Sequence, residues 1–294
     1  MKFSLVIGDI HTKKDSLDEV KEIMNELYYS QKDEIDEVIF LGDVINQSEK
    51  RINPEILEYI TKLIIDILKT SKITICIGNH ESISENLSTL NYLKYLGVNL
   101  IYHHGVIERS GNTIYLGHHF VDRSDTYYKD DRFKVKELSK KYNLCLTGHD
   151  HQYRQYCKNF INLGSIRRVI FSEVNYPCPK YLKLYSKSLK MTICDVKTAI
   201  PMIDVYSIEE ALKIDSRTKI RLIFTKFEDF LKSVNKLKKL EDKFNIFRIK
   251  HDYIVGVKNN KKIVKKKTFE ESFNNFLKTI KNKSVKNFIE ECVK

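Results

Sequence analysis

Three apolar runs in the first eighty residues each end in glycine followed by a polar residue. They are KFSLVIGD (2–9), EVIFLGD (37–43) and KITICIGN (72–79), and their length is typical of buried strands. Between the second and third runs, one helical face is apolar: Ile56, Leu57, Ile60, Leu63, Ile64, Ile67 and Leu68. Strand, helix and strand in this order predict a parallel sheet, whose strand ends open onto a common edge where ligands bind.

Shorter apolar runs follow from residue 101 onward. They are NTIYLG, NLCLTG, NFINLG, VIFSEV (169–174) and YLKLYS, and we interpret each as a strand. They predict a second sheet packed on the first. The expected fold class is α/β, with a two-layer β-sandwich core flanked by helices over residues 1–195 and a small C-terminal α+β capping domain over 196–294.

The positive charge is concentrated in the C-terminal part of the chain. Residues 180–294 hold 28 Lys and Arg against 14 Asp and Glu, whereas residues 1–179 hold 23 against 25. The excess of +14 therefore lies entirely in the second part, as expected for a module that binds a polyanion. A lysine-rich surface without function is the alternative interpretation.

Cysteine usage and hydropathy indicate a cytoplasmic protein. The six cysteines (76, 145, 157, 178, 194 and 292) form no CxxC pair, and several lie within apolar runs, which favours reduced thiols. The first apolar run is shorter than a signal-peptide core, and no stretch approaches 18 apolar residues. We therefore expect no membrane association.

Five short motifs with histidine, aspartate or asparagine stand at the ends of these apolar runs. In chain order they contain Asp9 and His11, Asp43, Asn79 and His80, His118 and His119, and His149 and His151. Any one of them is common turn chemistry. Five in this order exceed what structural requirements explain, so we predict a shared site.

The residue types of this site favour divalent metal ions. Imidazole, carboxylate and amide groups suit Mn²⁺, Fe²⁺ or Zn²⁺, with Mg²⁺ also compatible, and the lack of cysteine ligands disfavours a structural zinc site. Seven ligands are too many for one ion with an open position. They suit two ions about 3.5–4 Å apart that share a carboxylate, for which Asp43 is the natural candidate.

These five motifs resemble those of the calcineurin-like metallophosphoesterase superfamily. The resemblance implies one ion held by Asp9, His11, Asp43 and His151, and a second held by Asp43, Asn79, His118 and His149. A water bridging both ions would be the nucleophile. His80 matches the histidine of the family that is not a ligand and that stabilises the transition state or protonates the leaving oxygen.

Two assignments within these motifs stay open. His119 is the alternative to His118 as the ligand in the fourth motif. His103 and His104 match no motif position and are interpreted as surface or near-site residues.

The motifs of this chain differ from those of other branches of the superfamily, and the differences reduce the number of possible functions. Ser/Thr protein phosphatases carry an arginine after the second aspartate and end their fourth motif in His-Gly-Gly, whereas this chain reads GDVINQS and GHHFVD. Small phosphodiesterases usually end soon after the fifth motif. Here GHDH is followed by Gly-Ser, Ser-Glu and a tyrosine-containing strand, an order that resembles the SbcD-type nuclease subunit of bacteria and phages.

That resemblance extends to the tail and implies partners. The tail contains the strand KIRLIFT, then a helix, then the strand NIFRIKHDYIV; the helix face contains Phe227, Phe230, Leu231, Val234 and Leu237. Strand, helix and strand in this order resemble the DNA-capping domain of that nuclease. The resemblance implies DNA as substrate, a coiled-coil ATPase of the SbcC type as partner, and the cytoplasm of a bacterium or of an infected host. A homodimer is also expected. Two further amphipathic helices are expected over 269–293, closing the capping domain or docking on the ATPase.

Candidate DNA contacts are basic residues beside the site and in the tail, and they would neutralise phosphates without reading sequence. They are Arg167, Arg168, Lys261, Lys262, Lys265, Lys266 and Lys267. We therefore expect a metal-dependent DNA exonuclease or endonuclease. The alternatives are a phosphomonoesterase, protein phosphatase or small-molecule phosphodiesterase with an unrelated basic domain, and a non-enzymatic DNA-binding subunit.

Overall fold

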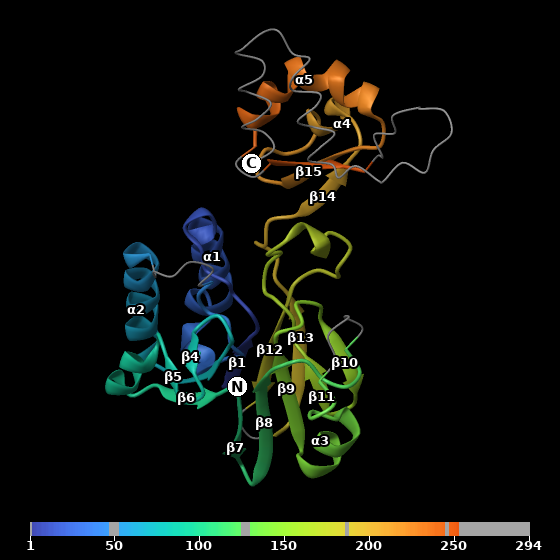
Figure 1. Cartoon of the computed structure of the whole chain (residues 1–294). Coiled ribbons are helices and arrows are strands. Elements are labelled where there is room, and N and C mark those ends of the chain that lie inside the picture. Colours follow the sequence, from blue (N-terminus) through green and yellow to red (C-terminus); the bar gives the residue numbers. More distant parts are fainter. Residues whose placement is uncertain (1, 47–52, 125–129, 186–187, 245–246, 253–294) are drawn as a thin grey trace. The chain divides into compact units, whose positions relative to one another are not determined.

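The computed structural model describes residues 2–46, 53–124, 130–185, 188–244 and 247–252 (Figure 1). The chain divides into two compact units, 1–200 and 201–294, so the first unit ends at Ile200, shortly after the boundary expected at residue 195. Each unit is described by itself.

The first unit contains a six-stranded sheet built around the three N-terminal apolar runs. Its order is β13-β12-β1-β2-β3-β6. β1, β2, β3 and β6 pair in parallel, as the strand, helix, strand pattern predicts. β12 pairs antiparallel with both β1 and β13, so the run YLKLYS, which was expected in the second sheet, lies in the first. The bounds are β1 Phe3–Ile7, β2 Ile35–Phe40, β3 Lys72–Ile77, β6 Asn99–Tyr102, β12 Lys180–Tyr185 and β13 Met191–Asp195.

A second, five-stranded sheet has the order β10-β11-β9-β8-β7. Its central strands β8, β9 and β11 are parallel, and β7 and β10 pair antiparallel at the two edges. The bounds are β7 His104–Arg109, β8 Asn112–His118, β9 Leu144–Gly148, β10 Arg154–Cys157 and β11 Phe160–Asn162; a short hairpin, β4 Ser82–Ser84 with β5 Leu87–Ser88, follows β3.

The two sheets pack face to face, and helices cover their outer faces. One apolar cluster joins Val6 and Ile39 of the first sheet to Leu116 and Leu146 of the second. α1 (Leu17–Met24) and α2 (Pro54–Leu68) cover the first sheet, while α3 (Val135–Lys141) packs on the second. Figure 1 shows α1 and α2 on one side of the sandwich and α3 on the other. The predicted two-layer β-sandwich flanked by helices is confirmed.

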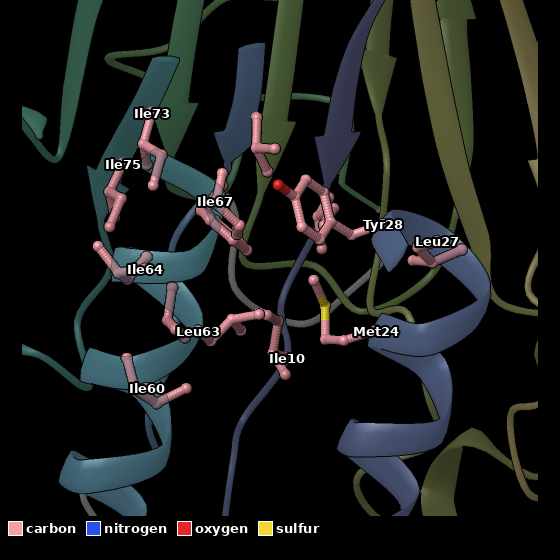
Figure 2. Packing of buried hydrophobic residues seen from close by; sticks show 14 of the residues in the cluster. Ile10, Met24, Leu27, Tyr28, Ile60, Leu63, Ile64, Ile67, Ile73 and Ile75 are labelled. Carbon is pink, nitrogen blue, oxygen red and sulfur yellow. The ribbon is translucent and has the colours of Figure 1, made fainter. Parts of the chain in front are cut away.

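The predicted apolar face of α2 forms the core beneath the first sheet. Ile60, Leu63, Ile64 and Ile67 are buried. Figure 2 shows these side chains directed into the space that also holds Met24 and Tyr28. The helix begins where sequence rules place it, because the Asn53 side chain accepts a hydrogen bond from the Glu55 amide and Pro54 occupies the first turn.

The described part of the second unit alternates strand and helix. β14 (Met202–Val205), β15 (Lys219–Phe224) and β16 (Phe247–His251) form a parallel sheet, and α4 (Ile208–Ala211) and α5 (Phe227–Glu241) connect them. Phe230, Val234 and Leu237 of α5 are buried against this sheet as predicted, whereas Leu231 is exposed. The amphipathic helices expected over 269–293 lie outside the described residues.

One expected strand is absent from its predicted place. Residues 169–174 were expected to form a strand, but Phe171–Glu173 form a 3-10 helix. Only part of this apolar run contributes to the core, because Phe171 is buried while Ile170 is 49% exposed.

The five cysteines of the described residues are free, in line with reduced thiols. Among the helices that the structure describes, none has the length and apolar character of a bilayer span.

Candidate metal centre

The seven predicted ligands and His80 follow five strands at the carboxyl edges of the two large sheets. Because β1, β2 and β3 are parallel in one sheet and β8 and β9 are parallel in the other, their ends bring distant sequence positions together. Asp9 and His11 follow β1, Asp43 follows β2, Asn79 and His80 follow β3, His118 ends β8, and His149 and His151 follow β9.

Asp9, His11 and His151 form a first group of ligand atoms. The three atoms all lie within 4.8 Å of one another. The Nε2 atoms of His11 and His151 are 2.9 Å apart, and Nε2 of His151 lies 3.7 Å from Oδ2 of Asp9. Asp9 and His11 are buried, and the His151 side chain is 19% exposed. These are three of the four residues that the family resemblance implies around one ion.

Asp43, His118 and His149 form a second group on the other side of the site. Nε2 of His118 lies 3.1 Å from Oδ2 of Asp43, 3.2 Å from Nδ1 of His149 and 3.1 Å from Oδ1 of Asn79. The Leu41 carbonyl oxygen lies 2.7 Å from Nδ1 of His118, which turns Nε2 toward the other ligands. The four residues implied around the second ion are therefore together.

Asp43 belongs to both sides of the site. Its Oδ2 also lies 3.4 Å from Nε2 of His11, and a third group joins it to His11 and His80. Nε2 of His80 is 3.9 Å from Oδ2 of Asp43, and the His80 amide donates to Oδ1 at 3.0 Å. The position of Asp43 fits the predicted shared carboxylate, and the partly exposed ring of His80 is accessible to a substrate.

Three of these residues hold the left-handed backbone conformation that non-glycine residues rarely adopt. The φ angles are 49° at His11, 47° at Asp43 and 85° at His149. Such strain persists where surrounding contacts enforce it, and it clusters at functional sites. Here the Asp43 carbonyl accepts from the amides of Ile10 and His11, and Asp9 accepts from the His149 amide at 2.9 Å.

Glycine precedes the ligands because the loops approach one another too closely for a side chain. A Cβ at Gly78 would lie 2.1 Å from Oδ1 of Asp43, and one at Gly148 would lie 2.4 Å from Oδ1 of Asp9. Both distances are far below van der Waals contact. The Gly of the GNHE and GHDH motifs is therefore required by the proximity of the carboxylates.

Burial and mutual proximity shift the pKa values of the site. Burial raises the pKa of Asp9 to about 6 and lowers that of His149 to about 3. Burial alone would lower the pKa of His118, but the carboxylates of Asp43 and Asp9 raise it to about 9. The pKa of His11 is lowered, first by burial and then by the neighbouring His151. Perturbations of this size mark functional sites.

The donors fit two divalent ions. The two facing Nε2 atoms of His11 and His151 can share at most one proton, whereas a cation would accept a lone pair from each. Nδ1 of His11 is buried and has no hydrogen-bond partner among the described residues. Nitrogen and oxygen donors that converge in this way are the ligands of Mn²⁺, Fe²⁺ and Zn²⁺ in proteins.

The two histidines of the fourth motif have different environments. His118 joins the ligands, whereas the His119 ring stacks on Phe133 at 3.5 Å between centroids, and its Nε2 lies 2.7 Å from the Tyr115 hydroxyl. His104 stacks on Tyr115, away from the ligands, and the main-chain oxygen of His103 accepts from the His118 amide. The geometry favours His118 as the ligand.

The predicted DNA contact at Arg167 needs correction. Arg167 is only 3% exposed, and its guanidinium donates to the carbonyls of Ile10 and His11 and pairs with Glu19 at 3.2 Å. A guanidinium held in this way is not available to a phosphate. It instead holds the loop that carries His11. The sequence could not separate it from an exposed arginine because the burial depends on α1.

Arg168 and the tail lysines remain predictions as DNA contacts. Arg168 is half-buried, and its guanidinium donates to the main-chain oxygens of Glu173 and Tyr176. Lys261, Lys262, Lys265, Lys266 and Lys267 lie outside the described residues.

Sequence patterns did not identify the residues that hold the predicted ligands, or the loops that carry them, by hydrogen bonds. The Ser165 hydroxyl donates to the main-chain oxygen of Asp9 at 2.8 Å, and Oε1 of Glu173 lies 2.5 Å from Nδ1 of His151. Glu81 is fully buried and accepts from the amides of Ile45 and Gly78. The Gly-Ser and Ser-Glu pairs after GHDH were the available signal for the first two.

Comparison with protein families agrees with this geometry. A family model described as calcineurin-like phosphoesterase matches residues 4–153. The match covers the five motifs up to His151, and the chain belongs to this family. Together with the clustered histidines and aspartates, membership supports a metal-dependent phosphoesterase with a dinuclear site.

Solved structures that match part of the chain include three at low sequence identity. Vps29 from Entamoeba histolytica, complexed with Zn²⁺, is 17% identical over 66% of this chain and 99% of its own, with a TM-score of 0.37. The protein of unknown function AQ665 from Aquifex aeolicus is 20% identical over 54% and 84%, with a TM-score of 0.35. Nuclease MPE from Pseudomonas putida is 15% identical over 54% and 66%, with a TM-score of 0.32. No curated protein matches the chain.

Proposed function

We propose that this phosphoesterase is a DNA nuclease of the SbcD type that uses two Mn²⁺ ions. The observation that carries the proposal is the position of Ser165 and Glu173. They belong to the Gly-Ser and Ser-Glu pairs on which the nuclease resemblance rests, and both contact metal-ligand residues, Asp9 and His151. The residues on which the nuclease resemblance rests thus contact predicted metal ligands.

The charge distribution also supports a nucleic-acid substrate. The excess of +14 in residues 180–294 would supply sequence-independent affinity for a phosphate backbone, with a strong dependence on salt. A small-molecule phosphoesterase has no evident need for such a module.

The side chains of the site suit hydrolysis of a phosphodiester. When bound, two divalent ions supply Lewis-acid activation of a phosphoryl oxygen and of water. His80 lies beside them, and its pKa is lowered, first by burial, so its ring is neutral at neutral pH. The neutral ring keeps one N–H, which can donate to a phosphoryl oxygen or to the leaving oxygen. The His80 amide, bonded to Asp43, holds this loop in register with the ligands.

A direct assay is Mn²⁺-dependent digestion of end-labelled linear duplex DNA by the full chain. An aryl phosphodiester, an aryl phosphomonoester and a phosphoprotein serve as parallel substrates, and excess chelator serves as the control for metal dependence. We expect DNA degradation that requires Mn²⁺, slower hydrolysis of the aryl diester, and little reaction with the other two.

The pattern of substrates separates this proposal from the alternative within the family. Rapid cleavage of the monoester or phosphoprotein with intact DNA would identify a phosphomonoesterase or protein phosphatase that carries an unrelated basic module. Binding of DNA without cleavage of any substrate would identify a non-enzymatic DNA-binding subunit.

We further propose DNA and an SbcC-type coiled-coil ATPase as partners, and a homodimer as the working state. Sedimentation of the full chain tests the dimer. Addition of the ATPase and ATP tests the partnership, and faster digestion of duplex ends is the expected result. Digestion that is unchanged by a complex-forming ATPase would contradict a functional partnership.

A further inference from the structure

Glu173 is a buried carboxylate whose contacts lead directly to the metal site. It is 2% exposed and ends the 3-10 helix Phe171–Glu173. Its Oε1 lies 2.5 Å from Nδ1 of His151, and its Oε2 accepts from the Val169 amide at 2.7 Å. Both carboxylate oxygens therefore have defined partners.

The backbone that carries Glu173 is held as firmly as its side chain. The Arg168 guanidinium donates to the Glu173 main-chain oxygen at 2.6 Å and to that of Tyr176 at 2.9 Å. The carboxylate thus approaches His151 from a braced turn. Its position is set by the fold rather than by a chance rotamer.

This contact decides which nitrogen of His151 faces the ions. A carboxylate beside Nδ1 requires the proton there, which leaves the lone pair of Nε2 free. Nε2 is the atom that lies 2.9 Å from Nε2 of His11 and 3.7 Å from Oδ2 of Asp9. The contact therefore presents the correct atom of His151 to the first group of ligands.

The other ligand histidines have different support. A main-chain oxygen faces Nδ1 of His118, and Nδ1 of His11 has no hydrogen-bond partner among the described residues. Within the described part of the chain, the ion pairs of the remaining ligand histidines are made with Asp9 and Asp43, which are predicted ligands themselves. His151 alone in this set has a carboxylate partner outside the ligand set.

We propose that Glu173 is a positioning residue of the metal site, which fixes the tautomer and orientation of His151 and thereby sets the affinity of the ion bound by Asp9, His11 and His151. Carboxylates that accept from a ligating histidine commonly have this effect, and their removal weakens metal binding about 10–100-fold. The inference rests on the metal binding that the proposed function requires, and it is independent of the DNA substrate.

The test measures metal binding rather than activity. The full chain is stripped of metal and titrated with Mn²⁺, and the free ion is followed by electron paramagnetic resonance. We expect two ions in the parent. In Glu173→Ala, we expect one of the two sites to be weakened about 10–100-fold while the other keeps its affinity. Glu173→Gln should weaken the same site less than Glu173→Ala does, because its amide oxygen can still accept from one of the two N–H donors.

Glu26→Gln is the matched control. Glu26 is a half-buried carboxylate that accepts from the amides of Lys197 and Thr198 and touches no predicted ligand. Its substitution should lower resistance to urea without changing either Mn²⁺ affinity. If Glu173→Ala does not fold, Glu173→Gln keeps the side-chain volume and carries the same comparison.

The outcomes separate this inference from the proposed function. A parent that binds no Mn²⁺ would overturn the proposed function. A parent with two ions, and Glu173 variants with the same two affinities, would overturn only the positioning role. Equal weakening of both sites, in proportion to a loss of stability, would also overturn it, because that result indicates a purely structural residue.

Discussion

Oδ2 of Asp43 lies 3.1 Å from Nε2 of His118 and 3.4 Å from Nε2 of His11, so a single carboxylate oxygen faces one histidine from each sheet. We predict that Asp43→Asn loses bound metal and turnover together, because the amide keeps the shape of the side chain but removes the negative charge that both groups of metal ligands share. Metal content by mass spectrometry and hydrolysis of an aryl phosphodiester are the measurements.

Asp195→Asn is a suitable control for this variant, since Asp195 is an exposed carboxylate that pairs with Lys180. It should keep both metal and turnover. Near-normal metal stoichiometry and turnover in Asp43→Asn would rule out the shared-carboxylate assignment.

His80→Ala should keep both ions and substrate binding while turnover falls about 10²–10⁴-fold, the usual contribution of a positioned proton donor. We place His80 beside the substrate rather than among the ligands because its ring lies next to Asp43 and is 29% exposed, whereas the side chain of the predicted ligand His118 is fully buried. Steady-state kinetics and metal content are measured on the same sample. Loss of an ion from this variant would show that His80 is a ligand.

Arg167→Met should unfold at a lower urea concentration, with a loss of about 3–5 kcal/mol, because it removes the guanidinium that pairs with buried Glu19 and donates to the main-chain oxygens of Ile10 and His11. Arg132→Met is the control, since Arg132 is exposed and pairs with Asp130 at the surface. It should change stability little. An Arg167 variant of parental stability but weakened DNA binding would restore Arg167 as a DNA contact.

Mn²⁺ affinity should increase as the pH rises from neutral toward about 9, where His118 loses its proton. Burial would lower the pKa of this ring, but Asp43 and Asp9 raise it to about 9, so an ion must displace a proton at neutral pH. The stability of the metal-free fold depends on pH in the opposite direction. The raised pKa stabilises the fold fully below the ordinary value of 6.5, and this contribution is lost as the pH rises through about 9.

Calorimetric titration in two buffers of different ionisation enthalpy measures the protons released on binding. We expect release at neutral pH that declines toward pH 9. Affinity and proton release that stay constant over this range would contradict the assigned protonation of His118.

Replacement of Lys261, Lys262, Lys265, Lys266 and Lys267 with Gln should flatten the salt dependence of DNA binding. Each lost phosphate contact should reduce the log–log slope by about 0.9 on duplex DNA. Turnover of a small phosphodiester should stay at the parental level, since the family match and the site end well before these residues. A variant with the parental slope and affinity would show that this run is a solvated surface.

Much of the fold and of the site could be predicted from local patterns. Runs such as KITICIG fill a buried strand, and the helical face of Ile60, Ile64 and Ile67 covers it. Once the strands are parallel, the polar residues that follow them must share one edge. Asp9 and Asp43 therefore share the edge of the first sheet, because they follow the neighbouring parallel strands β1 and β2.

The sequence by itself thus determined which residue types stand at the edge of the sheets, because strand periodicity and glycine placement are local properties. Only the tertiary structure decided their roles beyond that edge. Arg167 and Arg168 are neighbours of the same type, yet the approach of Glu19 on α1 buries one and leaves the other half-exposed. Glu173 reaches His151, which lies 22 residues earlier in the chain, from a turn held by hydrogen bonds that Arg168 donates. Burial and partner choice depend on segments distant in the chain, and no local pattern records which of them will meet.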